Sequence, residues 1–461
     1  MMLPSAALAD FIAALSAERV FTDAATLTLY SHDETPRSCL PDAVLFPASH
    51  EHVVALMRVA LAHHIALVAR GAGSGNVGGA LPAPGSAVVS FECMDAILEF
   101  NPADRYMVVQ PGVVTADIEL AARAHGLFYP PDPGSSPYCR IGGNLAMNAA
   151  GPRAVKYGVT RDYVLGLRAV TGTGAELRTG CRTTKGVTGY DLTRLLVGSE
   201  GTLGLITEAT LKLLPAPEAR ATLRVCYATN LDACAAVARV MNQAVVPCAL
   251  EFMDQRSIAA IQAAGAATDL PAGTEALLMV EADGAASDLP RQISALKAVL
   301  HGDGMLELVE AGNAADVAQL WQARRSLSHA VKRIAPLKIN EDVVVPVSRL
   351  AELVGYIDQL GERFALPIVS FGHAGNGNLH VNIMVNPSDP QQMKNAKQAL
   401  RALFSKVLEL GGTLSGEHGI GSEKRDYVSM EIDAGSLEMM RLIKAQFDPH
   451  GLLNPGKLLP Q

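Results

Sequence analysis

The sequence predicts an α+β protein with two α/β-like lobes, and three observations lead to this fold class. The first half places short apolar runs around glycine-rich loops, whereas the second half alternates strand-like with helix-like segments. The change of pattern falls at Pro215–Pro217, so we expect a domain boundary near residue 216. With 461 residues, 49% of them hydrophobic and 18% charged, the chain has enough apolar material for more than one core.

Net charge, cysteine content and the N-terminal sequence restrict the partners, redox state and location that we expect of the protein. The net charge is −8 and no long basic run occurs, so we expect no nucleic acid as a partner. The seven cysteines are odd in number and contain no C-x-x-C, which indicates reduced thiols. The N-terminus lacks the basic region of a signal peptide, and we expect a helix from near Pro4. No apolar run is long enough to span a membrane. A cytoplasmic enzyme is therefore expected.

The first half is expected to contain a helix, several strands and a long irregular segment. Apolar residues recur at helical spacing from Ser49 to about His64 and predict a helix there. Expected strands follow at 65–69, 87–91 and 106–112, with a helix at 115–126 and a loop running into a strand over 196–215. Segment 127–163 is dense in glycine, proline and asparagine, which indicates tight turns or close approach of the backbone to a ligand.

The second half is expected to alternate strands with helices. Expected strands lie at 221–228, 275–283, near 342–346 and from Asn378 onward, and expected helices at 230–244, 288–300, 314–333, 348–365, 390–410 and 435–447. Two segments rich in glycine and histidine, 371–380 and 411–422, flank the helix at 390–410. Such segments favour function over packing, because glycine lets the backbone approach a ligand closely.

A glycine loop at 70–80 fits the pattern G-x-G-x-x-G through Gly73, Gly75 and Gly78. A Rossmann loop must lead directly into a helix, whereas here GALPAPGSAVVSF follows, with two prolines and then a strand. We therefore expect a strand–loop–strand turn whose backbone N–H groups can cradle phosphate, with Arg70 as a charge partner. The alternative is an ordinary surface turn. Further glycine segments at 133–135, 142–144 and 198–204 favour a large flat ligand.

The tract FGHAGNGNLHVNIMV indicates a polar site on a strand. From Asn378 onward the residues alternate, so Asn378, His380 and Asn382 share one face. His373 precedes this strand, and Glu417-His418 lies in a second glycine loop. Two imidazoles and one carboxylate suit Zn²⁺, Mn²⁺ or Fe²⁺. The alternative for each histidine is a hydrogen-bonded polar side chain without a ligand.

Arg324 lies within the apolar stripe of the helix expected at 314–333, with Ser328 one turn further on. An unpaired buried charge is costly, so this arginine must reach solvent, pair with an acid or bind an anion. An ion pair with Glu341 or Asp342 is one alternative. A bidentate clamp on a ligand carboxylate is the other.

Seven motifs, taken in order over about residues 40–460, resemble one flavoprotein group. RGAGSG, PDPGSS, IGGNLAMNAAG and VGSEGTLGLITEATLKL resemble the FAD-binding domain of the vanillyl-alcohol-oxidase/PCMH superfamily. FGHAGNGNLHVN, GTLSGEHGIGSEKR and FDPHGLLNPGKLLP resemble the C-terminal half of its D-lactate dehydrogenase, glycolate oxidase and D-2-hydroxyglutarate dehydrogenase branch. The resemblance implies a PCMH-type two-lobed FAD-binding domain over 1–215 and an α/β substrate (cap) domain with an antiparallel sheet over 216–425. Segment 426–461 would return to the FAD domain.

The resemblance implies that FAD is bound non-covalently, because Ser74 stands where some members attach the flavin through a histidine. The pyrophosphate would be held by Arg70, Gly71, Ala72, Gly73, Ser74, Gly75 and Asn76. The rest of the nucleotide would be lined by Pro133, Gly134, Ser135, Gly142, Gly143, Asn144, Glu200, Gly204 and Ile206, with Asn454 from the C-terminal segment.

The same resemblance assigns a metal, a base and a substrate clamp. It implies that a divalent metal is bound by His373, His380 and Glu417, that His418 is the base, and that Arg324 binds the substrate carboxylate. Further substrate contacts would come from Ser328, Lys338 and Asn382, with Lys338 on a second carboxylate. One position departs from the family motif, since Asn376 replaces the usual aspartate. If that aspartate orients a metal-bound histidine, the metal would bind more weakly here.

The resemblance thus implies an FAD-dependent dehydrogenase that oxidises D-lactate or D-2-hydroxyglutarate with metal assistance. By analogy, electrons would pass to an electron-transfer flavoprotein, a quinone or a cytochrome, and a homodimer is among the expected assemblies. One alternative is the FAD subunit of a multi-subunit glycolate oxidase, and another is a non-catalytic flavoprotein subunit. A metallohydrolase that uses the histidines and the glutamate without flavin is the third.

Overall fold

The computed structural model describes residues 3–265 and 269–460, and the chain divides into two compact units. Unit 1 comprises residues 1–150, 159–216 and 417–461, and unit 2 comprises residues 151–158 and 217–416. The chain therefore stays in unit 2 from Pro217 to Gly416 and returns to unit 1 at Glu417, earlier than the expected residue 426. Segment 151–158 belongs to unit 2, which the sequence did not predict.

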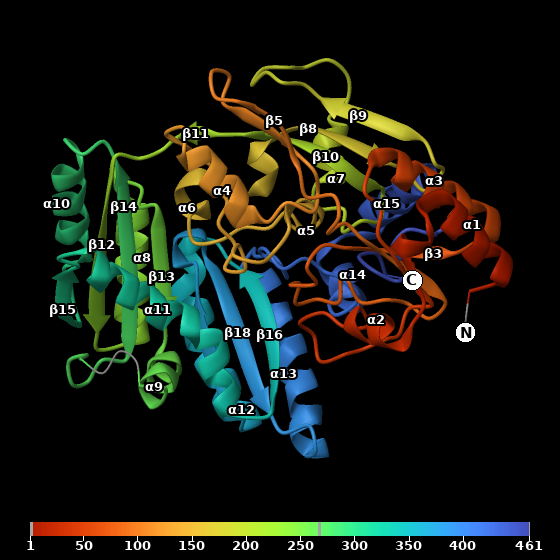
Figure 1. The fold of residues 1–461 in the computed structure, drawn as a ribbon. Helices are drawn as coiled ribbons and strands as arrows, with labels where there is room; N and C mark the ends of the chain where they lie inside the picture. Colours follow the sequence, from red (N-terminus) through yellow and green to blue (C-terminus); the bar gives the residue numbers. More distant parts are fainter. Residues whose placement is uncertain (1–2, 266–268, 461) are drawn as a thin grey trace. The chain divides into compact units, whose positions relative to one another are not determined.

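Unit 1 contains a four-stranded sheet that carries the glycine loop (Figure 1). Its strands, in spatial order, are β1 (Val20–Phe21), β2 (Ala43–Leu45), β4 (Ser86–Ser90) and β3 (Ala66–Arg70). β3 and β2 both run parallel to β4. Between β3 and β4 the chain forms no helix, so the loop over 71–85 differs from a Rossmann loop, as expected. Helices α1 (Ser5–Leu15) and α3 (His50–His63) share one apolar core with these strands.

A second sheet of unit 1 is antiparallel throughout and holds five strands. In spatial order they are β5 (Ile97–Asn101), β6 (Tyr106–Val109), β10 (Leu205–Lys212), β8 (Val164–Val170) and β9 (Glu176–Gly180). A two-stranded pair, β7 (Leu127–Phe128) with β11 (Leu214–Pro215), lies outside both sheets. The unit's other helices are α2 (Ala24–Leu29), α4 (Thr115–Arg123), α5 (Ile141–Met147), α7 (Leu192–Leu196), α14 (Val428–Glu431) and α15 (Ala434–Phe447). Beyond α15 the chain bridges to β3 through Leu453 and Leu67, so the C-terminal segment is part of this unit.

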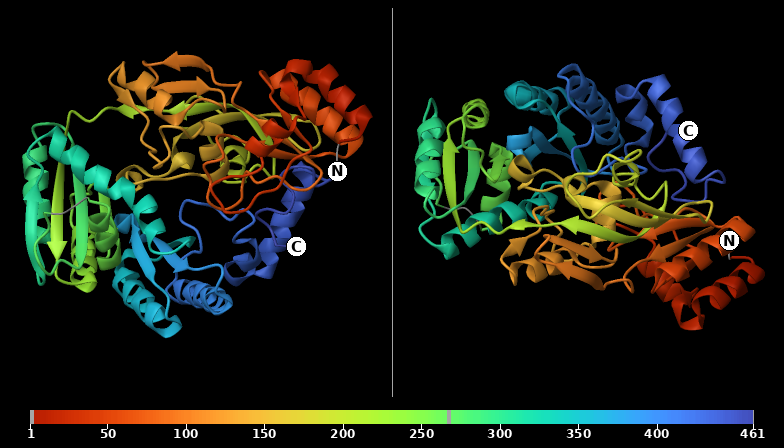
Figure 2. Two further views of the ribbon diagram at one scale, coloured as in Figure 1. Left: turned by 60° about the horizontal axis from the view of Figure 1, so that its bottom comes forward. Right: turned by 90° about the horizontal axis from the view of Figure 1, so that it is seen from above.

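Unit 2 is built on one seven-stranded sheet in which all neighbours are antiparallel (Figure 2). In spatial order the strands are β15 (Met305–Glu310), β12 (Ala219–Tyr227), β14 (Ala276–Gly284), β13 (Ala249–Met253), β17 (Ile368–Gly372), β18 (Asn378–Val385) and β16 (Leu337–Val344). The helices are α6 (Ala154–Tyr157), α8 (Asn230–Met241), α9 (Gln255–Ala263), α10 (Leu289–Leu300), α11 (Ala314–Ala330), α12 (Leu350–Phe364) and α13 (Pro390–Glu409). The predicted α+β class and the antiparallel sheet of the second domain are confirmed.

The two faces of this sheet differ. Helices α9 and α11 share an apolar core with Met253, Met279 and Phe371, side chains that point to one face. On strand β12, Cys226 belongs to this core. Tyr227, the residue after it, points to the other face and donates a hydrogen bond to the Leu300 carbonyl of α10, 2.7 Å away. The face under α9 and α11 also carries the polar residues described below. Among the described residues, no helix is both long and apolar enough to cross a membrane.

Candidate functional site

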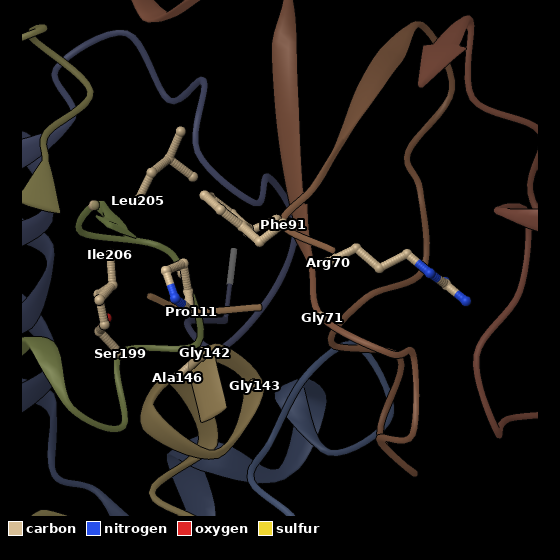
Figure 3. A pocket seen from close by; sticks show the side chains of 13 residues that line it. Arg70, Gly71, Phe91, Pro111, Gly142, Gly143, Ala146, Ser199, Leu205 and Ile206 are labelled. Carbon is tan, nitrogen blue, oxygen red and sulfur yellow. The ribbon is translucent and has the colours of Figure 1, made fainter. Parts of the chain in front are cut away.

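Unit 1 contains a cleft lined largely by backbone and small side chains (Figure 3). The lining comes from the end of β3, the segments that follow β4 and β6, helix α5, the turn at 199–204 and the start of β10. The residues are Ala69, Arg70, Gly71, Phe91, Pro111, Gly142, Gly143, Ala146, Ser199, Gly201, Gly204, Leu205 and Ile206. Of the predicted cofactor residues, the cleft therefore brings together Arg70, Gly71, Gly142, Gly143, Gly204 and Ile206. Apolar walls with exposed peptide groups suit a flat aromatic ligand.

Two adjacent glycines of α5 show how closely the cleft wall is built. A Cβ on Gly142 would lie 2.7 Å from the Pro111 Cβ and 2.9 Å from its carbonyl oxygen, so only glycine fits. The Gly142 amide donates to that same oxygen at 2.8 Å. A Cβ on Gly143 would meet no protein atom within 4 Å. Because Gly143 lines the cleft, the space beside it is available to a ligand.

Arg70 supports the glycine loop with its guanidinium and does not point into the cleft (Figure 3). Nη1 donates to the His32 carbonyl at 2.6 Å, and the guanidinium carbon lies 5.3 Å from the centre of the Tyr30 ring. Gly73 has a φ of +73°, and a Cβ there would lie 2.2 Å from Arg70 Nη2. The arginine therefore fixes the conformation of the loop.

Glu200 turns away from the cleft although its neighbours line it. Its φ of +54° places it in the left-handed region, which few non-glycine residues adopt. The buried carboxylate accepts hydrogen bonds from the amides of Ile420 and Gly421, both at 2.7 Å. Burial raises the pKa of Glu200, and these two amides oppose that rise. Glu200 thus holds the loop that follows His418.

The C-terminal segment closes this part of unit 1 with two buried polar residues. Asn454 donates to the Glu200 carbonyl at 2.5 Å and accepts from the Ala69 amide at 3.2 Å. Lys457, which the sequence analysis missed, donates to the Gly79 carbonyl at 2.7 Å. Burial lowers the pKa of Lys457 to about 8. A lysine in the NPGK turn of a glycine-rich tail was the only sequence signal for it.

The remaining predicted cofactor residues lie elsewhere in unit 1. Asn144 is buried and donates to the Thr115 hydroxyl at 2.8 Å. Pro133, Gly134 and Ser135 form a turn in which the Ser136 amide donates to the Pro133 carbonyl. Ala72, Gly73, Ser74, Gly75 and Asn76 follow Gly71 in the glycine loop.

Unit 2 gathers a second set of predicted residues on the sheet face under α11. His373 follows β17, His380 lies on β18, and their ring centres are 5.2 Å apart. Asp342 of β16 pairs in register with His380, and its carboxylate lies 3.9 Å from His380 Nδ1. This carboxylate is buried and accepts from the Asn378 amide group at 2.6 Å and from the Gly416 backbone at 2.8 Å. One sheet face thus holds two neighbouring imidazoles beside a fixed carboxylate.

Glu251 of β13, which the sequence analysis missed, joins Arg324 to His373. One carboxylate oxygen accepts from Arg324 Nε at 2.8 Å, and the other lies 2.6 Å from His373 Nδ1. Glu251 is fully buried. Burial disfavours its charged form, but the neighbouring charges of His373 and Arg324 outweigh this effect and lower the pKa of Glu251 to about 2. The ion pair of Arg324 is therefore made with Glu251, and not with Glu341 or Asp342.

The other predicted substrate residues, Ser328, Lys338 and Asn382, lie on α11, β16 and β18 of the same unit. The Arg324 guanidinium carbon lies 4.9 Å from the centre of the Phe371 ring, which fixes its plane. Lys338 Nζ donates to the Ser328 hydroxyl at 3.1 Å, so these two predicted residues lie together. Asn382 is fully buried and donates to the carbonyls of Val369 and His380, both at 3.1 Å.

Glu417 and His418 begin the part of the chain that returns to unit 1, in a loop without regular structure. Asn376, where the family motif has aspartate, is exposed in a short 3₁₀ turn, and its backbone amide donates to the His373 carbonyl at 3.0 Å. The carboxylate that orients His373 is that of Glu251.

Comparison with known proteins places this geometry in a family. Residues 216–458 match the model of the C-terminal domain of FAD linked oxidases, and residues 41–180 match an FAD binding domain. The glycolate oxidase subunit GlcD of Bacillus subtilis is 40% identical, with 93% of this chain and 92% of that protein covered. A D-2-hydroxyglutarate dehydrogenase of Stutzerimonas stutzeri is 35% identical, with 95% and 96% covered. A D-lactate dehydrogenase of Anaerostipes hadrus is 35% identical, with 93% and 92% covered.

Solved structures support the fold. p-Cresol methylhydroxylase superposes with a TM-score of 0.81 at 16% identity, covering 98% of this chain and 96% of that one. An alkyldihydroxyacetonephosphate synthase gives a TM-score of 0.77 at 20% identity, covering 99% and 86%. The predicted PCMH-type fold class is therefore confirmed.

Proposed function

The chain belongs to the family of FAD-linked oxidases, and from this premise we propose that it oxidises a D-2-hydroxy acid to the 2-oxo acid. An FAD-linked oxidoreductase of the D-2-hydroxy-acid dehydrogenase and glycolate oxidase type follows from the family itself. The observation that supports a D-2-hydroxy acid as the substrate is the Arg324–Glu251–His373 arrangement, which presents a guanidinium and an imidazole on one buried sheet face. A guanidinium binds a carboxylate in two-point fashion, as a 2-hydroxy acid requires.

The cleft of unit 1 fits FAD. The backbone beside Gly143 is open, Gly142 excludes any side chain, and the wall of Phe91, Leu205 and Ile206 is apolar. Ser74 offers no imidazole for covalent attachment, so non-covalent binding is proposed. When bound, the flavin would accept the hydride that leaves C2 of the acid.

The proposed reaction gives Arg324 and His418 separate roles. Arg324 Nη1 and Nη2 have no hydrogen-bond partner among residues 3–265 and 269–460, and they would bind the substrate carboxylate. His418 would take the proton of the C2 hydroxyl as general base. The acid thereby loses a proton and a hydride and becomes the 2-oxo acid. Electrons would then pass to an electron-transfer flavoprotein, a quinone or a cytochrome.

As ligands of a divalent metal we propose His373, His380 and Glu417. One Glu251 carboxylate oxygen lies 2.6 Å from His373 Nδ1, so this carboxylate orients the ring of a proposed metal ligand. Two imidazoles and one carboxylate suit Zn²⁺, Mn²⁺ or Fe²⁺. A bound metal would lower the pKa of the substrate hydroxyl.

The side-chain pocket is proposed to include Ser328 and Lys338. A positive Lys338 beside the Ser328 hydroxyl suits a second carboxylate, as in D-2-hydroxyglutarate, whereas D-lactate would leave it unused. A second candidate function is the FAD subunit of a multi-subunit glycolate oxidase. The 40% identity to the GlcD subunit favours this candidate, and a requirement for partner subunits would distinguish it.

The first experiment is anaerobic titration of the purified protein with D-lactate, L-lactate, glycolate and D-2-hydroxyglutarate, followed by the visible spectrum. Bleaching of the flavin band by one D-acid would support the proposal. A yellow protein that glycolate alone bleaches, or that turns over only with added subunits, would favour the second candidate. A yellow protein that no acid reduces would contradict both. The matched variant His418→Ala should bind FAD normally and lose almost all flavin reduction.

A further inference from the structure

His50, the first residue of helix α3, is buried and connects two strands of the five-stranded sheet of unit 1. Its Nδ1 lies 2.8 Å from the hydroxyl oxygen of Thr207 on β10, and its Nε2 lies 2.8 Å from a carboxylate oxygen of Glu176 on β9. Because both ring nitrogens are hydrogen-bonded, the imidazole is held in one orientation. The helix is thereby tied to both strands.

Thr207 is the inserted residue of a β-bulge in the strand that lines the flavin cleft. The register of β10 against β8 shifts between Ile206 and Glu208, which leaves Thr207 without a partner residue of its own on β8. A bulge bends its strand and redirects the side chains beside it. Ile206 lines the cleft directly before this bulge, so the direction of its side chain depends on how the bulge is held.

Two contacts hold the side chain of Thr207, which is fully buried. The hydroxyl donates to the Arg168 carbonyl of β8 at 3.1 Å, and it also lies in hydrogen-bond contact with His50. Because a β-branched side chain has few allowed χ1 states, a second contact on the hydroxyl selects one rotamer. His50 therefore helps to fix the bulge on the side opposite to β8.

Glu176 holds the other end of the imidazole. The hydrogen bond from His50 lowers the pKa of Glu176, so the carboxylate is ionised and accepts from Nε2. The same carboxylate lies 3.4 Å from Arg168 Nη2, and Nη1 of this arginine donates to Glu208 at 2.9 Å. A continuous set of contacts thus runs from half-exposed Glu176 through His50 to the bulge of β10.

We propose that His50 is a positioning residue of the flavin cleft, which holds Thr207 in the bulge and thereby directs the side chain of Ile206 into the cleft. His50 is not one of the residues that line the cleft, so its effect on FAD is indirect. The inference rests on the binding of FAD in the cleft and is independent of the substrate proposed above. The two can therefore fail separately.

Titration of the apoprotein with FAD, followed by visible circular dichroism of the bound flavin, tests this role. His50→Ala should bind FAD about 2- to 10-fold more weakly and change the flavin spectrum, because one hydrogen bond to the bulge is lost. Asparagine places its amide where Nδ1 stands, so His50→Asn should restore both affinity and spectrum. Glutamine places its amide where Nε2 stands, so His50→Gln should keep the Glu176 contact and resemble His50→Ala.

Thr207→Val separates the bulge from the rest of the contacts. Valine keeps the branched shape but has no hydroxyl, so this variant should lose FAD affinity to the same degree as His50→Ala. Adding His50→Ala to Thr207→Val should cause no further loss of FAD affinity, although the melting temperature should fall further because the bond to Glu176 is also removed. Losses of FAD affinity that simply add would contradict the role of the bulge.

His63→Ala is the matched control. His63 is the last residue of the same helix, and its Nε2 lies 2.7 Å from the Asp10 carboxylate, far from β10 in the helix. This variant should keep the FAD affinity and flavin spectrum of the wild type. The inference is refuted if His50→Ala matches the wild type in both, if His50→Gln does so, or if His63→Ala loses as much affinity as His50→Ala.

A second pair of variants covers the case in which His50→Ala does not fold. Thr207→Val is then compared with Thr222→Val, which removes the hydroxyl of a buried threonine on β12 of unit 2 that donates to Glu281 at 3.1 Å. Only Thr207→Val should weaken FAD binding, and equal affinities in the two variants would overturn the inference. If the variants behave as expected but no acid reduces the flavin, the role of His50 stands and the proposed substrate class fails.

Discussion

Glu200→Gln should loosen the loop that carries His418 without changing the cleft wall. The Glu200 carboxylate accepts from the amides of Ile420 and Gly421, each at 2.7 Å, and is buried. Glutamine retains one acceptor oxygen, and its amide group would oppose the second N–H. The variant therefore loses one hydrogen bond to a charged acceptor and leaves one buried amide without a partner.

The magnitude follows from those two bonds. A hydrogen bond to a charged group contributes about 1.5–3 kcal/mol. Since 1.36 kcal/mol corresponds to a factor of ten, local opening of the loop should become about 10- to 100-fold more frequent. The pKa of Glu200 is raised by burial, so the neutral glutamine also recovers part of the cost of burying a charge. The free energy of unfolding of the whole protein should therefore fall by an amount near the lower end, about 1.5 kcal/mol.

Amide hydrogen exchange measures this effect directly. The amides of Ile420 and Gly421 should lose protection in Glu200→Gln, and the rate of flavin reduction should fall if His418 is the base. Glu208→Gln is the matched control, because this half-buried acid of the same unit pairs with Arg168 at 2.9 Å and does not contact the loop. Unchanged protection of both amides in Glu200→Gln would refute the reasoning, whatever happens to activity.

Three further predictions test the cleft, the clamp and a buried acid. Gly143→Ala should leave the apoprotein as stable as the wild type and weaken FAD binding at least tenfold. Gly142→Ala, with a Cβ 2.7 Å from Pro111, should instead lower the melting temperature. Wild-type FAD affinity in Gly143→Ala would contradict the assigned cleft. Arg324→Lys keeps the charge but loses the two-point contact, so the KM for the acid should rise about 10- to 100-fold with FAD affinity unchanged, and an unaltered KM would exclude the clamp. Burial raises the pKa of Asp254 to about 6, so the folded state holds a proton that the unfolded chain releases above pH 3.8. This group should therefore lower the free energy of unfolding by about 2 kcal/mol as the pH rises from 4 to 7. Carbon-13 NMR of the Asp254 carboxyl should show the midpoint near pH 6, and a midpoint near 4 would contradict this.

Elements with a clear hydrophobic period could be predicted from the sequence. Helix α3 and the strands β3 and β4 lie within a residue or two of their expected positions, because alternation or helical spacing of apolar residues determines which face is buried. The antiparallel strand from Asn378 was predicted for the same reason. The glycine loop was recognised as different from a Rossmann loop because two prolines and a strand follow it.

What the sequence did not reveal depends on contacts between distant residues. Strand β13, ALEFM, reads as a short apolar run, and nothing local shows that Glu251 meets Arg324, which lies on α11. Segment 151–158 reads as loop, yet Lys156 bonds Asp283 of β14 and thereby joins unit 2. Glu200 follows Ser199 in a motif that lines a cleft, but its left-handed backbone turns the side chain away.

Glu200 and Glu251 are chemically alike but have different roles, and the groups that bond to each carboxylate determine its role. Each is a buried carboxylate that accepts two hydrogen bonds, and each costs free energy to bury. The donors to Glu200 are backbone amides, so its loss changes the conformational freedom of a loop. The groups bonded to Glu251 are the side chains of Arg324 and His373, so its loss changes the orientation of those side chains. Amide exchange of Ile420 and Gly421 should therefore speed up in Glu200→Gln and stay unchanged in Glu251→Gln, and a loss of protection in both variants would contradict this distinction.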